Sequence, residues 1–305
     1  MRHTFDSIRR AAVAGCLCLA AGPLGLYVPQ SMANDSYPGA IDDLRIAKGA
    51  GIVAEAWLAD PTQRYRHFVL GSQYEPETIA VRLRNGEILT LTLPPDSVFE
   101  DRQPRLADLT GDGVDEIVLV RSYIDSGAAL AVVGLVRNTL QVIAETPPTG
   151  RPNTWLNPAG IADFNGDGRT EVAYVQMPHV LGLLRVWTLV EAGTPGTTGK
   201  SSGTYAFREI ATLSNTSNHV YGSPELGLSA VGDFNGDGTP DLAVPSKDLK
   251  TIRFLRLTDQ WQEFDRVKLK SRIAEDFDAI STSAGRWVII GKRKAGNLPR
   301  RYTDY

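Results

Sequence analysis

A run of oxygen-bearing side chains recurs three times in this chain with constant spacing. Each copy begins with Asp, has Gly at its sixth position and carries side-chain oxygens at positions 1, 3, 5 and 9. Ca²⁺ prefers about six to eight hard oxygens, and a glycine at position 6 permits a sharp bend, while the carbonyl of position 7 supplies another ligand. The predicted calcium ligands are Asp108, Thr110, Asp112, Val114 and Glu116; Asp163, Asn165, Asp167, Arg169 and Glu171; and Asp233, Asn235, Asp237, Thr239 and Asp241.

Zinc, magnesium, an EF-hand and a plain turn fit these loops less well than calcium. The loops contain no Cys or His, which disfavours Zn²⁺, and Mg²⁺ prefers fewer protein ligands and more water. An EF-hand needs a bidentate Glu at position 12, where this chain has Leu119, Tyr174 and Val244. Asn-Gly and Asp-Gly also form plain hairpin turns without metal. Turn formation explains the glycines and one Asp, but not oxygens at the same four positions in all three copies.

The three segments resemble the calcium loops of FG-GAP/VCBS-type repeats, which form the blades of integrin-α-like β-propellers. The consensus of those loops is Asp-x-Asn/Asp-x-Asp-Gly-x-x-Asp/Glu-Leu/Ile. The second and third copies match it, whereas Thr110 departs from it in the first copy and is expected to weaken that site. The resemblance implies a calcium-binding β-propeller that acts in adhesion or ligand display outside the cell or in a periplasm.

The segments around the loops have the patterns of strands, and no long helical period competes with them. The chain is therefore predicted to be all-β. An insert over 192–203 is rich in Gly, Thr and Ser and is predicted to be a long flexible hairpin loop. The outer strands of the repeats are predicted at 77–84 and 87–93, 128–136 and 139–145, 181–191 and 204–213, and 250–258 and 260–269.

The repeat spacing predicts a β-propeller with five blades, and six blades are the alternative. Repeats begin near 60, 108, 163, 233 and 283, at intervals suited to four-stranded blades. The first, over 60–68, is interpreted either as a degenerate loop in which Arg64 replaces the ion or as a simple surface loop. The last is expected to turn at 285–286. The segment 42–48 is expected to complete the last blade, so that N- and C-terminal strands close the ring.

The propeller geometry predicts two different faces. All three calcium loops join the first strand of a blade to the second, so they are expected to share one face. The loops on the other face are richer in aromatic, amide and carboxylate side chains, which suits a small polar ligand such as a sugar. The alternative is that these aromatics only pack against the blades. The candidate ligand-face residues are Tyr123, Asp125, Trp155, His179, His219 and Tyr221.

Residues 1–33 have the pattern of a secretory signal peptide. Basic residues precede an apolar stretch over 11–28, and Ser31-Met32-Ala33 suits cleavage after Ala33. A secreted or periplasmic protein is therefore predicted, with 34–305 as a single propeller domain. A membrane anchor is disfavoured because Pro23 interrupts a stretch that is short for a span. A lipoprotein box ending at Cys16 is the other alternative. Both cysteines, Cys16 and Cys18, lie in this segment, so the mature chain would contain no disulfide.

The net charge and the absence of two sequence motifs disfavour several classes of function. Removal of 1–33 takes away three Arg and one Asp and changes the formal net charge from −3 to −5, which argues against a nucleic-acid partner. Neither a nucleophile elbow nor a phosphate-binding loop occurs. The expected function is a binding or adhesion module for carbohydrate or another protein, without catalytic residues. A polysaccharide-active lyase or hydrolase, and a purely structural protein, remain alternatives. The oligomeric state is left open.

Overall fold

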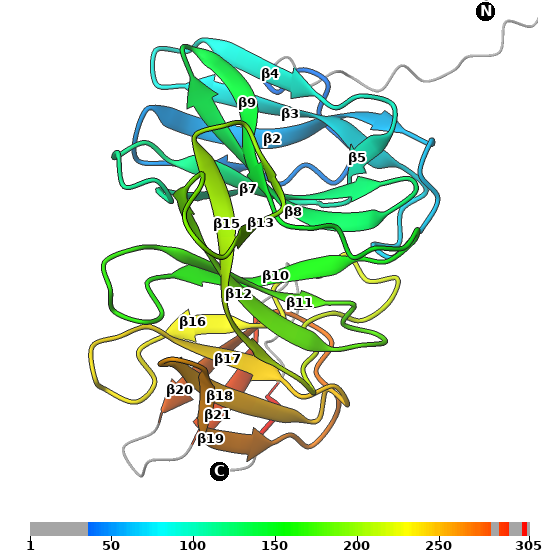
Figure 1. Cartoon of the computed structure of the whole chain (residues 1–305). Coiled ribbons are helices and arrows are strands. Elements are labelled where there is room, and N and C mark those ends of the chain that lie inside the picture. Colours follow the sequence, from blue (N-terminus) through cyan, green and yellow to red (C-terminus); the bar gives the residue numbers. More distant parts are fainter. Residues whose placement is uncertain (1–35, 282–286, 293–300, 304–305) are drawn as a thin grey trace, which may run out of the picture. The chain divides into compact units, whose positions relative to one another are not determined.

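Antiparallel sheets built from consecutive strands make up the computed structural model, which describes residues 36–281, 287–292 and 301–303 (Figure 1). No helix occurs in these ranges, which confirms the prediction of an all-β chain. The described strands form five sheets that follow one another along the sequence. The predicted signal segment 1–33 and the predicted turn at 285–286 lie outside the described residues.

The first two sheets are formed mainly by residues 47–145. The first has the order β1-β2-β3-β4. The second has the order β14-β9-β8-β7-β5, and β6 also pairs with β7. Their strands are β1 (Ala47–Lys48), β2 (Val53–Thr62), β3 (Glu75–Leu83) and β4 (Ile88–Thr92); and β5 (Ser97–Phe99), β6 (Arg105–Ala107), β7 (Glu116–Tyr123), β8 (Gly127–Val136), β9 (Thr139–Glu145) and β14 (Lys200–Ser201).

The other three sheets follow with the orders β10-β11-β12-β15-β13, β16-β17-β18-β19 and β20-β21. All eight predicted outer strands form, with ends within two residues of those expected. The strands are β10 (Leu156–Ala162), β11 (Glu171–Gln176), β12 (Leu183–Glu191), β13 (Thr197–Thr198) and β15 (Tyr205–Leu213); β16 (Ala230–Gly232), β17 (Asp241–Pro245), β18 (Thr251–Leu257) and β19 (Trp261–Lys268); and β20 (Phe277–Ser281) and β21 (Trp287–Gly291).

The hydrophobic core lies between successive sheets. One apolar cluster joins the first sheet to the second, and three more join the second to the third, the third to the fourth and the fourth to the fifth. Strands β7 and β8 are therefore buried over nearly their whole length, which explains their continuous Val, Ile, Leu and Ala content, because both of their faces pack against apolar neighbours. This stacking sets the loops of neighbouring repeats side by side.

The predicted closure of a ring by the N-terminal segment is wrong for the described residues. β1, at the end of the segment 42–48, pairs with β2 of the first sheet, with Ala47 opposite Ala56. No sheet in the described ranges is closed, and no described strand joins the first sheet to the last. The physical reason is local, since a four-residue connection returns the chain onto β2 at little entropic cost. The number of blades stays a prediction.

The segment 60–68 is not a degenerate metal loop. Asp60 lies within β2, whose last residue Thr62 pairs with Glu75. The connection that corresponds to the metal loops joins β1 to β2 over 49–52 and contains no carboxylate. Arg64 donates to the carbonyl of Ser97 and pairs with Glu77. The first repeat therefore begins earlier than predicted, because an Asp and a Thr two residues apart are a weak signal alone.

The insert 192–203 contains two short strands, β13 and β14, that the sequence did not predict. β13 pairs with β15 of its own sheet, whereas β14 pairs with β9 of the second sheet, with Lys200 opposite Glu145. Gly199 permits this crossing, because a Cβ at that position would lie 1.9 Å from the carbonyl oxygen of Glu145. Its φ of +88° is also rare for other residues. The predicted hairpin loop therefore forms between β12 and β15, and it also adds a short strand to the second sheet.

Candidate functional site

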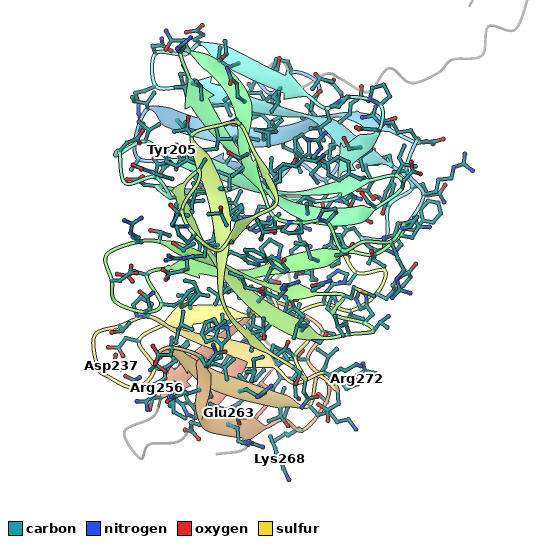
Figure 2. All side chains as sticks on the ribbon, in the orientation of Figure 1. Tyr205, Asp237, Arg256, Glu263, Lys268 and Arg272 are labelled. Atoms are coloured by element: carbon teal, nitrogen blue, oxygen red, sulfur yellow. The ribbon has the colours of Figure 1, made fainter. Side chains whose placement is uncertain are left out.

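The three candidate metal loops occupy equivalent positions in the second, third and fourth sheets. They span 108–115, 163–170 and 233–240, and they join β6 to β7, β10 to β11 and β16 to β17 (Figure 1). The first two loops line one common cavity. A Cβ on Gly166 of the second loop would lie 3.8 Å from Thr239 Oγ1 of the third. Figure 2 shows Asp237 of the third loop and Arg272 on opposite sides of the fourth sheet.

Backbone hydrogen bonds fold the loops in the same way. The first aspartate of each loop accepts from the N–H of the glycine at position 6, at distances of 2.9, 2.9 and 3.0 Å. The aspartate at position 5 accepts from the N–H of position 7, at 2.8, 2.9 and 2.8 Å. The glycines at position 6 have φ between +83° and +88°, a region that L side chains rarely adopt. These bonds draw the carboxylates of positions 1 and 5 inward.

The carboxylate at position 9 is buried in all three loops. Glu116, Glu171 and Asp241 each accept a hydrogen bond from the backbone N–H of position 2, at 2.9, 2.8 and 3.0 Å. Burial raises the pKa of Glu116 and of Glu171 to about 7, and the neighbouring aspartates add to the effect. Burial also raises the pKa of Asp241. A bound cation would remove this penalty, because it favours the charged form.

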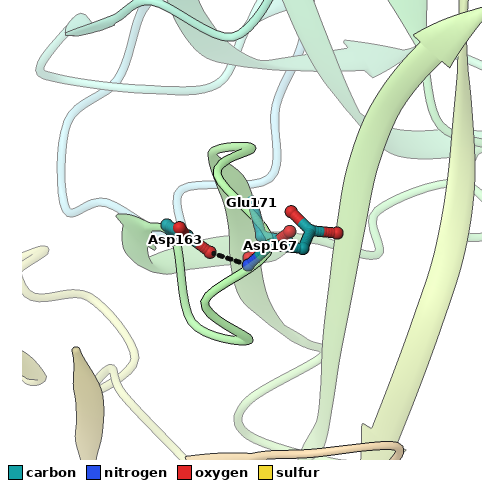
Figure 3. Close-up of side chains that lie close together, drawn as sticks. All are labelled: Asp163, Asp167 and Glu171. Carbon is teal, nitrogen blue, oxygen red and sulfur yellow. Dashed lines mark hydrogen bonds between the residues drawn. The ribbon is translucent and has the colours of Figure 1, made fainter. Parts of the chain in front are cut away.

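The second loop fits a metal ion best. Asp163, Asp167 and Glu171 (Figure 3) each offer a carboxylate oxygen, and these oxygens lie within 4.8 Å of one another. Glu171 is fully buried, and its Oε1 has no hydrogen-bond partner in the described structure. An unpaired buried carboxylate oxygen is costly unless a cation or a donor compensates it. Hard oxygens with no nitrogen or sulfur among them suit Ca²⁺.

The first loop differs at the position where its sequence departs from the pattern. The Thr110 hydroxyl donates to Glu116 Oε1 at 3.3 Å, so it engages the oxygen whose counterpart is unpaired in the second loop. In the third loop the amide of Asn235 lies 3.3 Å from Asp241 Oδ1. The position-9 oxygen is therefore engaged in the first and third loops alike, and the weaker first site stays a prediction. The predicted position-7 ligands Val114, Arg169 and Thr239 contribute only backbone carbonyls in this scheme.

On the side opposite the metal loops, four of the six candidate ligand-face residues come together. His179 Nε2 lies 2.9 Å from His219 Nδ1. The Trp155 ring stacks on His179 with centroids 6.4 Å apart, and Tyr221 meets His179 edge-on at 5.5 Å. Two cavities of about 120 and 290 Å³ adjoin these rings, and His179 and Tyr221 line both. Tyr221 is 59% exposed, whereas Trp155 and His219 are buried.

The hydrogen bonds determine which nitrogens of the two histidines carry protons. His219 Nε2 lies 2.9 Å from the carbonyl oxygen of Ser223, which can only accept, so this nitrogen carries the proton. The neutral ring then has an acceptor at Nδ1, and His179 Nε2 must donate to it. His179 Nδ1 is consequently left with a lone pair. Burial lowers the pKa of His179 to about 4 and that of His219 to about 3, so both rings are neutral at pH 7.

These histidines should make the folded chain sensitive to acid. Between pH 6.5 and about 4 the unfolded chain protonates both rings while the folded chain does not, so their contribution to stability is present above pH 6.5 and is lost as the pH falls. The double variant His179→Gln/His219→Gln should lose several kcal/mol less than the wild type over this range, because each proton taken up only by the unfolded chain costs about 1.4 kcal/mol per pH unit. Chemical unfolding at several pH values measures this difference, and parallel pH profiles would contradict it.

Sequence reasoning did not assign a role to a third histidine on this side. His67 Nδ1 lies 2.7 Å from Oε1 of the fully buried Glu100, and Trp155 Nε1 donates to the carbonyl of Glu100 at 2.9 Å. The His67 ring lines the smaller cavity, while Tyr221 donates to the His67 carbonyl. Because Glu100 is fully buried, it can orient the His67 imidazole but cannot itself contact a bound molecule. The only sequence signal was an acidic pair, Glu100-Asp101, directly after an apolar strand.

Tyr123 and Asp125 do not join this group. Neither residue lines the two histidine cavities. The Tyr123 hydroxyl donates to Glu145 and accepts from Lys200 Nζ at 2.9 Å, and the same ammonium lies 4.0 Å from the Tyr123 ring centroid. Lys200 belongs to the crossing insert, which sequence reasoning treated as a free loop. Asp125 is exposed in the turn between β7 and β8.

One segment of the chain matches a known protein family. The FG-GAP repeat family model matches residues 228–248, a segment that contains the third loop with the strands β16 and β17 around it. The chain therefore carries an FG-GAP-type repeat within an all-β fold, as its sequence predicted. No curated protein matches the chain. The described ranges contain no helix of the length and apolar character needed to cross a membrane.

Proposed function

We propose that this protein is an exported calcium-binding β-propeller that acts as a binding or adhesion module. Calcium would be structural and would occupy the loops that contain Asp108, Asp163 and Asp233. The ligand, a carbohydrate or another protein, would bind on the opposite side near His179 and Tyr221. The FG-GAP repeat at 228–248 and the five successive antiparallel sheets support a propeller-type binding module.

The observation that carries the calcium proposal is the unpaired, fully buried Oε1 of Glu171 beside Asp163 and Asp167. The other two loops repeat the backbone hydrogen bonds of this one. Nine carboxylates, three in each loop, would hold the ions together with Thr110, Asn165, Asn235 and the position-7 carbonyls. A bound cation would neutralise the carboxylates and cross-link each loop, and the mature chain would contain no disulfide to do so.

Export would place the protein where calcium is plentiful. The support is the basic start, the apolar stretch and the small residues before Ala33. Extracellular calcium modules bind with dissociation constants of about 10⁻⁴–10⁻³ M. N-terminal sequencing of protein recovered from the secreted or periplasmic fraction tests this part, and a mature chain that begins at Asn34 is expected.

Calcium should stabilise the folded chain. With dissociation constants in that range, 10 mM calcium would contribute about 1.4–2.7 kcal/mol for each occupied site. Thermal unfolding in EDTA and in 10 mM calcium measures the gain. Glu171→Gln should lose the increment of one site, because it keeps an acceptor for the Phe164 N–H but removes a charge. The matched control is Glu87→Gln in the exposed β3–β4 turn. Equal midpoints in EDTA and calcium would refute the calcium proposal.

The histidine side should contribute directly to ligand binding. A glycan array identifies ligands of the wild type. Such a ligand should bind Tyr221→Ala at least about tenfold more weakly, because loss of the contact with the exposed ring reduces the binding free energy by roughly 1–2 kcal/mol. Phe68→Ala is a suitable control, since Phe68 is also an exposed aromatic residue but does not line the two cavities. Equal binding by Tyr221→Ala and the wild type would exclude this side as the binding surface.

A further inference from the structure

A cavity on the metal-loop side is larger than either histidine cavity. Its volume is about 960 Å³, and it lies between the first and second metal loops, beside the end of β12 and the start of β15. This volume is at the upper end of the range for small-molecule sites, about 300–1,000 Å³. Figure 2 shows Tyr205, which lines this cavity, on the same side of the molecule as Asp237. None of the candidate ligand-face residues lines it.

Two arginines in this cavity lack a protein partner. Arg169 extends from position 7 of the second loop, and Arg208 lies on β15 opposite Thr188 of β12. Within the described part of the chain, neither guanidinium forms an ion pair or a hydrogen bond. Arg185 on β12 of the same sheet instead pairs with Glu209 at 2.6 Å. A free guanidinium presents a planar set of donors that matches a carboxylate in two-point contact.

The third element of the cavity is Tyr205 at the start of β15. Its ring packs against the apolar cluster shared by the second and third sheets, which fixes its position. No hydrogen bond engages its hydroxyl in the described structure. A fixed aromatic ring beside free polar donors suits a sugar ring, because the ring packs on the sugar while its hydroxyl and the guanidinium groups contact polar substituents. The predominantly polar lining makes an apolar peptide anchor a poor occupant.

The charges in the cavity depend on the metal loops. Asp108, Asp167 and Glu191 line it together with the two arginines. With the other four ligand carboxylates of the two loops, Asp112, Glu116, Asp163 and Glu171, the formal charge is −5 without metal. One divalent cation in each of the two loops would change this formal charge to −1. An anion would therefore be repelled less strongly by the loaded cavity than by the metal-free one. The effect of calcium on this cavity rests on the proposed function, whereas the presence of two free arginines does not depend on it.

We propose that this cavity is a second binding site, specific for a carboxylate-bearing saccharide. Arg169 and Arg208 bind the carboxylate groups of the uronate sugars, and Tyr205 supports a sugar ring between them. Calcium in the adjacent loops raises the affinity by offsetting the aspartates. The site is separate from the histidine side and requires neither His179 nor Tyr221.

Binding of an unsulfated chondroitin hexasaccharide, measured by calorimetry on the mature chain in 5 mM calcium, tests this proposal. Arg169→Ala and Arg208→Ala should each weaken binding about tenfold, the effect of losing one charge-assisted contact. Lys268→Ala removes an equal charge from an exposed position outside the cavity and should change binding less than about twofold. A neutral chitin hexasaccharide should bind at least about tenfold more weakly than the acidic one. Arg169→Ala keeps the backbone carbonyl, so calcium should stabilise all three variants as it does the wild type.

Several results would overturn the site. These are the absence of binding in calcium, equal affinity of both arginine variants and the wild type, and equal binding of a hexa-aspartate peptide, which would indicate charge attraction alone. If calcium stabilises the chain but the arginine variants bind normally, this inference fails and the calcium proposal stands. If calcium has no effect on unfolding while arginine-dependent binding persists in EDTA, the calcium proposal fails and the arginine site stands.

Discussion

Arg102→Met is expected to destabilise the folded chain by about 3–5 kcal/mol, the range for breaking a buried ion pair. The Arg102 side chain is 1% exposed and lies 2.9 Å from Glu75, which is equally buried. It also donates to the carbonyls of Asp101 and Tyr74. Burial raises the pKa of Glu75, and the Arg102 guanidinium opposes this rise. Without Arg102 the carboxyl group would take up a proton, and two carbonyls would lose their donor.

Chemical unfolding of Arg102→Met beside Arg185→Met provides a matched comparison. Arg185 pairs with Glu209, but both side chains are more than a quarter exposed, so its loss should cost only about 0–1 kcal/mol. Adding Glu75→Gln to Arg102→Met should leave most of the loss in place, because the introduced amide would also be buried without the guanidinium donor. Similar losses for the two single arginine variants would show that burial does not control the energy of these pairs.

Phe164→Ala is expected to cost about 3–5 kcal/mol, the range for emptying a large core side chain. Phe164 is 1% exposed, and its ring meets Trp261 of the next sheet edge-on at 5.5 Å. Its N–H donates to Glu171 Oε2, so the same residue fixes the metal loop and joins the third sheet to the fourth. Substitution should therefore also reduce the stabilisation gained from calcium.

Urea unfolding in EDTA and in calcium separates these two effects. Phe68→Ala serves as the control, because Phe68 is 42% exposed and its loss should change the free energy of unfolding by less than about 0.5 kcal/mol. A loss below about 1 kcal/mol in Phe164→Ala would mean that this ring does not anchor the loop. An unchanged calcium increment in a destabilised variant would mean that Phe164 supports the sheets but not the ligand geometry.

Local sequence signals predicted most of the strands. The pair β3 and β4 is joined by Asn85-Gly86, and each metal loop connects two apolar runs, so these hairpins follow from turn residues and short-range pairing. The pairing partners of β1 and β14 could not be predicted from local sequence, because they depend on which strand nearby has an unpaired edge. A Gly-rich insert looks flexible in isolation. Only the close approach of Gly199 to the Glu145 carbonyl explains its path.

The candidate site was predictable to a similar degree. The carboxylates of the three loops were identified because their spacing repeats within one chain. The buried state of Glu171 also follows from the pattern, since position 9 begins a strand. Glu100 gave almost no signal, because its role depends on His67, which lies 33 residues earlier, and on Trp155, which lies 55 residues later. Contacts between repeats of this kind carry no fixed spacing.

The crossing of β14 to β9 means that the repeat in the sequence is not the repeat in the structure. The outer edge of the second sheet is completed by Lys200–Ser201, which come from the third repeat. Deleting or duplicating a unit at the sequence boundaries would therefore leave β9 with unpaired backbone groups, an edge that invites pairing with other chains. The second and third repeats must therefore be kept together for the second sheet to be complete. A rearrangement of the gene that separates them would give an aggregation-prone product, even though every repeat motif remained intact.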